Sequence, residues 1–516
     1  MPSPRHSAAD ESLDQAFLIE NDRMLADNGA LMMAEESLPK RKLRRDRPLR
    51  TVAVRQFLLS FIGGVAALQA GCAHYPVNAK LEKYEPPRIT MGAALNAPNR
   101  ADDLLLMVSF SGGGTRAAAL AYGVLEALNE VQLPSRPDAS ASPEGRDRRL
   151  VQEVDLVTGV SGGSLTAAYF AWQGQGIFKD YKQNFLNRNV TWGLIWRLLN
   201  PINMYRIASA YYSKSDLEAE YFDDVLFHGA TFSDLNPLKG PALIVQATDI
   251  SDGYYFTFSP LQFGIICSDL SSYPLSRATA ASSSVPGPLG AITLRNYAGQ
   301  CGFQDETWMA TALVNPDFTN RAYRFAAQAR SYTDWKDKPF IHLVDGGISD
   351  NLGLRAYLDL FMAYQDIPTA LRDRGLEHVR RIAFIIVNAE AKRSTRRWSL
   401  LEENPGLTDV GDVALTAMIN HYTFESTSLL RGMVKEWSAF RRAEAPNEPP
   451  LDYYVIEVSF HALSNANEQA SFMDLPTSFN LSDEEVDRLR EVAKRILHSR
   501  PDFHRLVRDL GGTILG

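Results

Sequence analysis

Residues 104–128 read LLLMVSFSGGGTRAAALAYGVLEAL, and this stretch decides the fold class. Leu104 to Phe110 is an almost continuous apolar run, as expected of a strand that is buried on both faces of a parallel sheet. It runs directly into three glycines, and Ala117 to Leu128 then has the composition of a helix. A strand, a glycine turn and a helix in this order predict the first unit of an α/β sheet.

The same alternation of short apolar runs and helical patterns continues after Pro86. We expect further strands at residues 154–158, 242–247, 254–258, 340–344, 382–387 and 453–458. A second helix begins near Ser164, and a terminal helix over residues 481–498 opens with Ser482 and Glu485, which form a capping-box pair. The predicted fold is α/β, with three α/β/α layers and a largely parallel central sheet.

The composition is that of an ordinary globular protein. The 516 residues are 45% hydrophobic and 22% charged, which excludes a chain disordered throughout and a membrane protein with many spans. The formal net charge of −8 gives no global attraction to nucleic acid, so we expect no nucleic-acid partner.

Charge is segregated at the amino end. Residues 1–36 hold eight acidic and two basic side chains, whereas residues 40–55 hold eight basic and one acidic. The uncharged run that follows is marginal in length for a membrane span, and with the basic stretch before it has the layout of an export signal. The alternative is a nucleic-acid patch beside a buried helix.

These boundaries divide the chain into four expected parts. They are a disordered acidic and then basic segment (1–55), an apolar signal or anchor (56–72), a linker (73–100) and a catalytic domain (101–516) with a possible aromatic-rich cap around residues 173–232. For the aromatic residues of the cap region, an ordinary core-facing helical pair is the other interpretation.

The apolar run ends in Leu68-Gln69-Ala70-Gly71-Cys72, which resembles the lipobox of bacterial lipoproteins with Cys72 as the lipidated residue. Gln69 stands where that family usually has leucine, so an uncleaved anchor or a start codon placed too early are the alternatives. All three place the body outside the cytoplasm, in the cell envelope. Ala73 is not the aspartate that retains lipoproteins in the inner membrane, which favours the outer membrane. Cys267 and Cys301 either pair there or remain two buried thiols.

Ser111-Gly112-Gly113-Gly114-Thr115-Arg116 joins the first strand to its helix, where consecutive backbone N–H groups form an anion site. A phosphate loop, an oxyanion hole and a tight structural turn compete as explanations. No lysine of a Walker loop follows, and Ala117 replaces the last glycine of the dinucleotide pattern. An oxyanion hole is therefore the best of the three.

Two further glycine turns follow strands. Gly159-Val160-Ser161-Gly162-Gly163 is G-x-S-x-G between a strand and a helix, a turn that projects a serine above the sheet. The run from Phe340 to Gly347 is a strand that ends in Asp345 and two glycines. Each is weak evidence alone. The sequence holds no CxxC or HExxH, so it predicts no metal.

Together, SGGGTR, GVSGG and VDGG resemble the motifs of the patatin-like phospholipase family in type and order. Residues 280–287 (AASSSVPG) are similar to that family's Ala/Ser-rich block before a proline. The resemblance covers roughly residues 104–354 and implies a patatin-like fold and a lipid acyl hydrolase that needs no cofactor and acts on membrane lipid or other acyl esters.

By this resemblance, Ser161 is the nucleophile and Asp345 the general base of a dyad. The amides of Gly112, Gly113 and Gly114 form the oxyanion hole, and Arg116 fixes the loop or meets an anionic head group. Partial desolvation would make the aspartate a better base than it is in water.

Two other hypotheses stay open. The first is an α/β-hydrolase triad in which Ser161 and Asp345 act with a late histidine; the candidates are His421, His461, His498 and His504. The second is an envelope lipoprotein that keeps the fold without catalysis. His342, on the strand before Asp345, is more typical of a hydrogen-bonded core histidine.

Overall fold

The central sheet is built around β1 (Leu104–Phe110), the strand that opens the quoted stretch. The computed structural model describes residues 73–85, 100–135, 147–363, 371, 375–391, 400–444 and 451–515. Strand β1 pairs in parallel with β3 (Val154–Val160) and with β8 (Arg381–Asn388). On the outer sides, β4 (Ala242–Asp249) adds in parallel to β3, and β9 (Asp452–Ser459) adds in parallel to β8.

Three antiparallel strands complete the sheet on the β4 side. They are β5 (Tyr254–Phe258), β6 (Ile292–Arg295) and β7 (Phe340–Val344), and the order along the sheet is β6-β7-β4-β3-β1-β8-β9 with β5 also paired to β4. The short strands β2 (Val131–Gln132) and β10 (Thr513–Ile514) form a separate antiparallel pair. The sheet is thus mostly parallel, as predicted.

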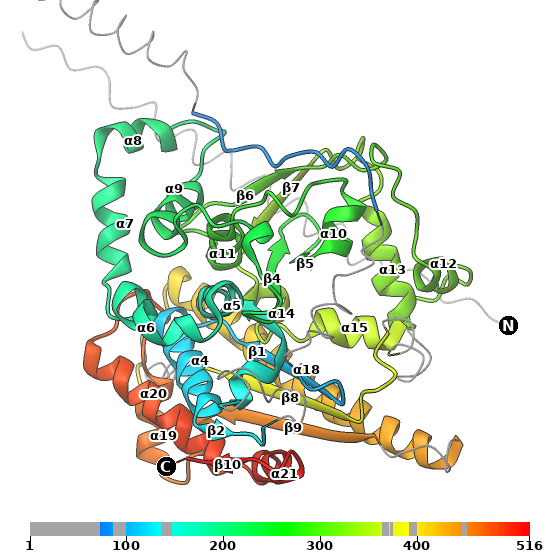
Figure 1. Cartoon of the computed structure of the whole chain (residues 1–516). Coiled ribbons are helices and arrows are strands. Elements are labelled where there is room, and N and C mark those ends of the chain that lie inside the picture. Colours follow the sequence, from blue (N-terminus) through cyan, green and yellow to red (C-terminus); the bar gives the residue numbers. More distant parts are fainter. Residues whose placement is uncertain are drawn as a thin grey trace, which may run out of the picture. The chain divides into compact units, whose positions relative to one another are not determined.

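Helices cover both faces of the sheet. One core contains buried side chains of α4 (Gly114–Asn129), α5 (Gly162–Gln173), α11 (Leu275–Ser283) and α20 (Asp483–His498). The other core contains buried side chains of α15 (Arg355–Ala363) and α18 (Leu407–Glu444). Helices α4 and α20 pack side by side (Figure 1). This is the three-layer α/β/α arrangement that the sequence predicts.

The described residues contain further α-helices. They are α6 (Ile177–Tyr181), α7 (Val190–Leu198), α8 (Pro201–Ile207), α9 (Lys214–Phe222), α10 (Pro260–Ile265), α12 (Thr307–Ala312), α13 (Arg321–Ser331), α14 (Gly347–Asp350), α19 (Ala466–Met473) and α21 (Pro501–Asp509). At the start of α20, the Ser482 side chain accepts the Glu485 amide while the Glu485 side chain accepts the Ser482 amide. The predicted capping box is therefore present.

The first described residues pack on the body, although they belong to the segment expected to be a linker. Asn78 is buried, and its Nδ2 donates to Ser268 Oγ over 2.8 Å and to the Arg295 carbonyl over 3.0 Å. Nearby, Cys267 and Cys301 form a disulfide. At residues 73–85 the expected linker is therefore part of the folded body.

The acidic and basic segment, the apolar run and Cys72 lie outside the described residues. Within the residues that are described, no helix is both apolar enough and long enough to span a bilayer.

Candidate active site

Ser161 occupies a strained turn between β3 and α5. Its φ of 49° and ψ of −127° are unusual for a residue with a side chain, and such conformations persist only where the surroundings fix them. The Ser161 amide donates to Ser282 Oγ over 2.8 Å, and the side chain is buried. A β-carbon at Gly162 would lie 2.0 Å from the Gly114 carbonyl oxygen, so only glycine allows this close approach.

The structure brings Ser161 and Asp345 into direct contact. Ser161 Oγ donates to Asp345 Oδ2 over 2.9 Å, although 184 residues separate them along the chain. The other carboxylate oxygen, Oδ1, accepts the Gly347 amide over 2.8 Å. Both oxygens therefore have partners, and the serine proton points at a carboxylate without an intervening side chain.

Strand β4 explains why these two turns meet. Gln246 of β4 pairs with Val160, the residue before Ser161, and its carbonyl oxygen would lie 2.4 Å from a β-carbon at Gly346. The same carbonyl accepts the Ser282 hydroxyl over 2.5 Å. One strand residue thus fixes the turn of the serine, the turn of the aspartate and the end of α11.

The end of α11 also holds the aspartate from its backbone. The Asp345 amide donates to the Ser284 carbonyl over 2.9 Å, and the Gly346 amide donates to the Ser282 carbonyl over 3.0 Å. These serines belong to the Ala/Ser-rich block of the sequence, which therefore buttresses the site. Their hydrogen bonds were not foreseen from the sequence.

Burial raises the pKa of Asp345 to about 6, while hydrogen bonds from the Gly347 amide and the Ser161 hydroxyl act in the opposite direction. Protein surrounds the carboxylate, although the residue keeps partial access to solvent. The group is then mostly ionised at pH 7 and is a stronger base than an aspartate in water.

The glycine loop lies beside the serine and leaves two backbone donors unused. Gly113 and Gly114 have φ values of 140° and 60°, and their amides donate to no other residue in the described part of the chain. A β-carbon at Gly112 would lie 3.2 Å from the Ser161 β-carbon. Two free amides beside a serine side chain are what an oxyanion hole requires.

For Gly112 the structure corrects the prediction. Its amide donates to the Asn351 carbonyl over 3.0 Å, so it is not a free donor for an oxyanion. The Asn351 side-chain oxygen would lie 2.5 Å from a β-carbon at Gly112, which explains the glycine by close packing instead. Asn351 had no signal in the sequence, because a lone asparagine six residues after Asp345 belongs to no motif.

Arg116 supports the loop. Its buried guanidinium donates to the Ala389 carbonyl over 3.0 Å, to the Leu475 carbonyl over 2.5 Å and to Thr477 Oγ1 over 3.1 Å. Two roles were predicted for Arg116, fixing the loop or meeting an anionic head group. These contacts agree with the first, and the guanidinium is shielded from solvent.

A second carboxyl group, that of Glu218 on α9, lies near the dyad. The side chain is fully buried, and neither of its oxygens has a hydrogen-bond partner among the described residues. The neighbouring Ser283 hydroxyl donates to the Thr279 carbonyl instead. Burial first, and then the charge of Asp345, raise the pKa of Glu218 well above its ordinary value. Sequence reasoning missed this residue.

Residues 108–358 match the patatin-like phospholipase family. The chain carries a patatin-like phospholipase domain. The matched residues include Ser161 and Asp345 and make up just under half of the chain.

Two solved structures illustrate the distance to characterised proteins. Human GIVD cytosolic phospholipase A2 is 12% identical, with 85% of this chain and 66% of that chain covered and a TM-score of 0.39. VipD from Legionella pneumophila is 11% identical, with 86% of this chain and 74% of that chain covered and a TM-score of 0.26. This chain thus spans just under two thirds of the human enzyme. No curated protein matches it.

The late histidines have other partners or are exposed. His461 is within hydrogen-bonding distance of Gln469 and lies 3.6 Å from Glu390, while His504 contacts the His498 carbonyl. His421 is exposed on α18. His342, expected in the core, is also exposed and contacts Thr293 over 3.0 Å. None of them forms a hydrogen bond with Ser161 or Asp345 in the described structure.

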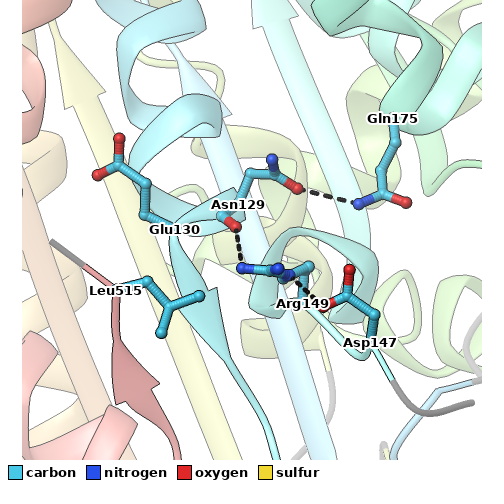
Figure 2. Close-up of a pocket in the computed structure, with 6 residues that line it drawn as sticks. All are labelled: Asn129, Glu130, Asp147, Arg149, Gln175 and Leu515. Carbon is cyan, nitrogen blue, oxygen red and sulfur yellow. Dashed lines mark hydrogen bonds and ion pairs between the residues drawn. The ribbon is translucent and has the colours of Figure 1, made fainter.

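A cavity of about 450 Å³ lies at the other end of α4 from the glycine loop. Its lining consists of Asn129, Glu130, Asp147, Arg149, Gln175 and Leu515 (Figure 2). Helix α4 has 16 residues, so about 24 Å separates its two ends. None of the predicted site residues lines this cavity, and hydrogen bonds from Gln175 and Arg149 to Asn129 brace it.

The aromatic residues of the expected cap divide into two groups. Tyr212, Tyr221 and Phe222 are buried, as the core-facing interpretation predicts. Trp192 and Trp196 are more than half exposed, so this interpretation is wrong for the first part of the segment.

Proposed function

We propose that the chain is a serine acyl hydrolase that cleaves lipid acyl esters through a dyad of Ser161 and Asp345. The observation that carries this proposal is the 2.9 Å hydrogen bond from Ser161 Oγ to Asp345 Oδ2 at a strained strand-to-helix turn. The membership of residues 108–358 in a phospholipase family supports lipid as the substrate class.

The reaction begins with attack of Ser161 Oγ on the ester carbonyl carbon. The serine proton passes to Asp345, and the negative charge that develops on the carbonyl oxygen is stabilised by the amides of Gly113 and Gly114. The intermediate collapses to an acyl-serine, and Asp345 returns its proton to the departing alcohol. Because its pKa is raised to about 6, protonated Asp345 is an effective donor for this step.

Hydrolysis of the acyl-serine repeats these steps with water as the nucleophile. Water gives one proton to Asp345 and attacks the acyl carbon. The second intermediate releases the carboxylic acid, and the proton on Asp345 returns to Ser161 Oγ. Each proton that Asp345 accepts is given back, so the cycle needs no other reactant.

A fluorophosphonate probe and a panel of phospholipids, lysophospholipids and neutral esters test the proposal. Labelling of the wild type and its loss in Ser161→Ala are expected, together with a fall in turnover of more than about a thousandfold in both Ser161→Ala and Asp345→Asn. His461→Gln and His498→Gln are the controls and should retain activity. Absence of labelling in the folded wild type, or loss of turnover on replacing one of these histidines, contradicts the dyad.

We further propose that the enzyme works in the bacterial cell envelope, attached to the outer membrane through lipidated Cys72. The disulfide between Cys267 and Cys301 supports an oxidising compartment. Metabolic labelling with an alkyne fatty acid tests the attachment. Label is expected in the wild type and not in Cys72→Ser, and label retained by that variant contradicts it.

A further inference from the structure

Helices α7 and α8 form an apolar projection at the edge of the body (Figure 1). On α7 only Val190 is buried, and α8 has no buried residue. The exposed large hydrophobic side chains here are Trp192, Trp196, Leu199, Ile202, Met204, Tyr205 and Tyr211. Seven large apolar side chains exposed on or beside two successive helices are rare on a soluble surface unless another apolar phase covers them.

The charges around this projection point to the chemistry of that phase. Residues 188–215 contain no acidic residue and four basic ones. Of these, Arg197 pairs with Asp224 and Arg206 with Glu220 of the neighbouring segments. Tryptophan and tyrosine together with arginine and lysine are the side chains that gather where a bilayer meets water, because each joins an apolar body to a polar end.

The chain enters the folded body beside this projection. Ser209 Oγ donates to the Ala73 carbonyl over 2.6 Å, and the Tyr75 amide donates to the Tyr211 carbonyl over 2.7 Å. The His74 ring also stacks on the ring of Tyr211. Because Ala73 directly follows the apolar run of residues 56–72, any anchor in that run is attached at this edge.

The projection is also connected to the glycine loop. The amides of Val190 and Thr191, at the start of α7, donate to the Phe479 carbonyl over 3.1 and 3.3 Å. The preceding residue, Ser478, accepts the Thr115 amide over 2.9 Å. A single loop therefore contacts both the first turn of α7 and the loop beside Ser161.

From these observations we propose that the exposed face of α7 and α8, defined by the seven side chains above, inserts into the interfacial layer of a lipid bilayer. It sets the orientation of the site toward the bilayer, next to the point where the chain is tethered. That the bilayer also supplies the substrate rests on the proposed function. Insertion itself does not require catalysis.

The test uses the full chain carrying Ser161→Ala, reconstituted in vesicles of phosphatidylcholine brominated on its acyl chains with added phosphatidylglycerol. Bromine quenches tryptophan only at short range inside the bilayer. We expect the emission of this Ser161→Ala protein to be quenched and at least half of that quenching to disappear when Trp192→Phe and Trp196→Phe are added. Trp335→Phe, which changes an exposed tryptophan in the turn after α13, should retain it.

A second measurement uses active protein and two matched double variants. Trp196→Ser with Ile202→Ser changes side chains that are 69% and 70% exposed, and Val314→Ser with Phe318→Ser changes side chains that are 71% and 75% exposed. The first pair should raise the KM for vesicle substrate about tenfold, with unchanged turnover of a water-soluble ester. The second pair should change neither value.

Two results overturn the proposal. One is equal quenching of the Ser161→Ala protein with and without the two phenylalanine substitutions. The other is a wild-type oligomer that Trp196→Ser with Ile202→Ser converts to a monomer, which would assign the face to protein contacts. Quenching needs no turnover. If the chain with Ser161 intact hydrolysed no ester while the Ser161→Ala chain was quenched, the hydrolase would be refuted and the docking face would remain.

Discussion

Asp345→Asn should make the protein more stable while it removes turnover. Burial raises the pKa of Asp345 from 3.8 to about 6, so the folded protein holds this proton more tightly than the unfolded chain. Asparagine keeps an oxygen for the Gly347 amide and an amide for Ser161 Oγ, and it never ionises. The variant therefore removes the free-energy cost of holding a buried charge.

The magnitude follows from that pKa difference. A gap of about two pKa units at 1.36 kcal/mol each gives about 3 kcal/mol, and partial solvent access to the carboxylate reduces this to about 2–3 kcal/mol. Because the pKa of Asp345 is raised in the folded protein, the stability gain of the variant grows as the pH rises. Below about pH 4 the aspartic acid is neutral in both states, so the variant gains nothing. Above about pH 6 the wild type bears the whole cost, so the gain is complete.

Urea denaturation of the wild type and Asp345→Asn, at intervals from pH 4 to pH 8 with the disulfide intact, measures this difference. Asp350→Asn is a matched comparison, because Asp350 is also buried and its pKa is also raised to about 6. It should show the same rise in stability with pH. A difference that is constant with pH, or a variant that becomes less stable above pH 6, would refute the reasoning.

Three further changes test other parts of the site. A β-carbon at Gly112 lies 2.5 Å from the Asn351 side chain, so Gly112→Ala should lower kcat/KM more than tenfold, whereas Gly411→Ala, which has open space, should not. Removing the Cys267–Cys301 disulfide by double serine substitution should lower the free energy of unfolding by about 3–4 kcal/mol in urea, given 34 residues of separation. Glu218→Gln should leave kcat/KM at pH 7 within about twofold, because burial raises the pKa of Glu218 and favours its neutral form, which glutamine resembles in shape. A shift of the acid limb of the rate profile by a full pH unit would indicate that this carboxyl is charged.

Strands were predictable where an apolar run in the sequence reflects burial in the sheet. The ranges expected for β1, β5 and β7 agree with the structure to the residue, because each is a short apolar run between polar or glycine boundaries. Strand β6 has four residues and was not predicted. Helix α18 has 38 residues, but among its described side chains Leu430 and Met433 are the only buried apolar ones, so its apolar pattern is weak.

The two side chains of the proposed dyad were predictable from the sequence, but the contacts that hold them were not. Ser161 and Asp345 follow strands and precede glycines, which gives them a signature in the sequence. The contacts of Asn351, Ser282 and Glu218 depend on packing between distant segments. The sequence also did not predict the direction of β7. This strand, which leads to Asp345, runs antiparallel to β4.

The support of the glycine loop extends well beyond the family match, which ends at residue 358. The Ser111 amide donates to the Val387 carbonyl over 3.0 Å, and Ser111 Oγ accepts the Ala389 amide over 2.9 Å. Arg116 reaches Leu475, and Thr115 donates to Ser478. A chain cut after Leu358 would keep Ser161 and Asp345 but lose every one of these contacts, together with strands β8 and β9 on one side of β1. An oxyanion hole acts through donors fixed in advance. If the glycine loop has the proposed role, the catalytic unit therefore has to continue at least through α20, which packs along α4.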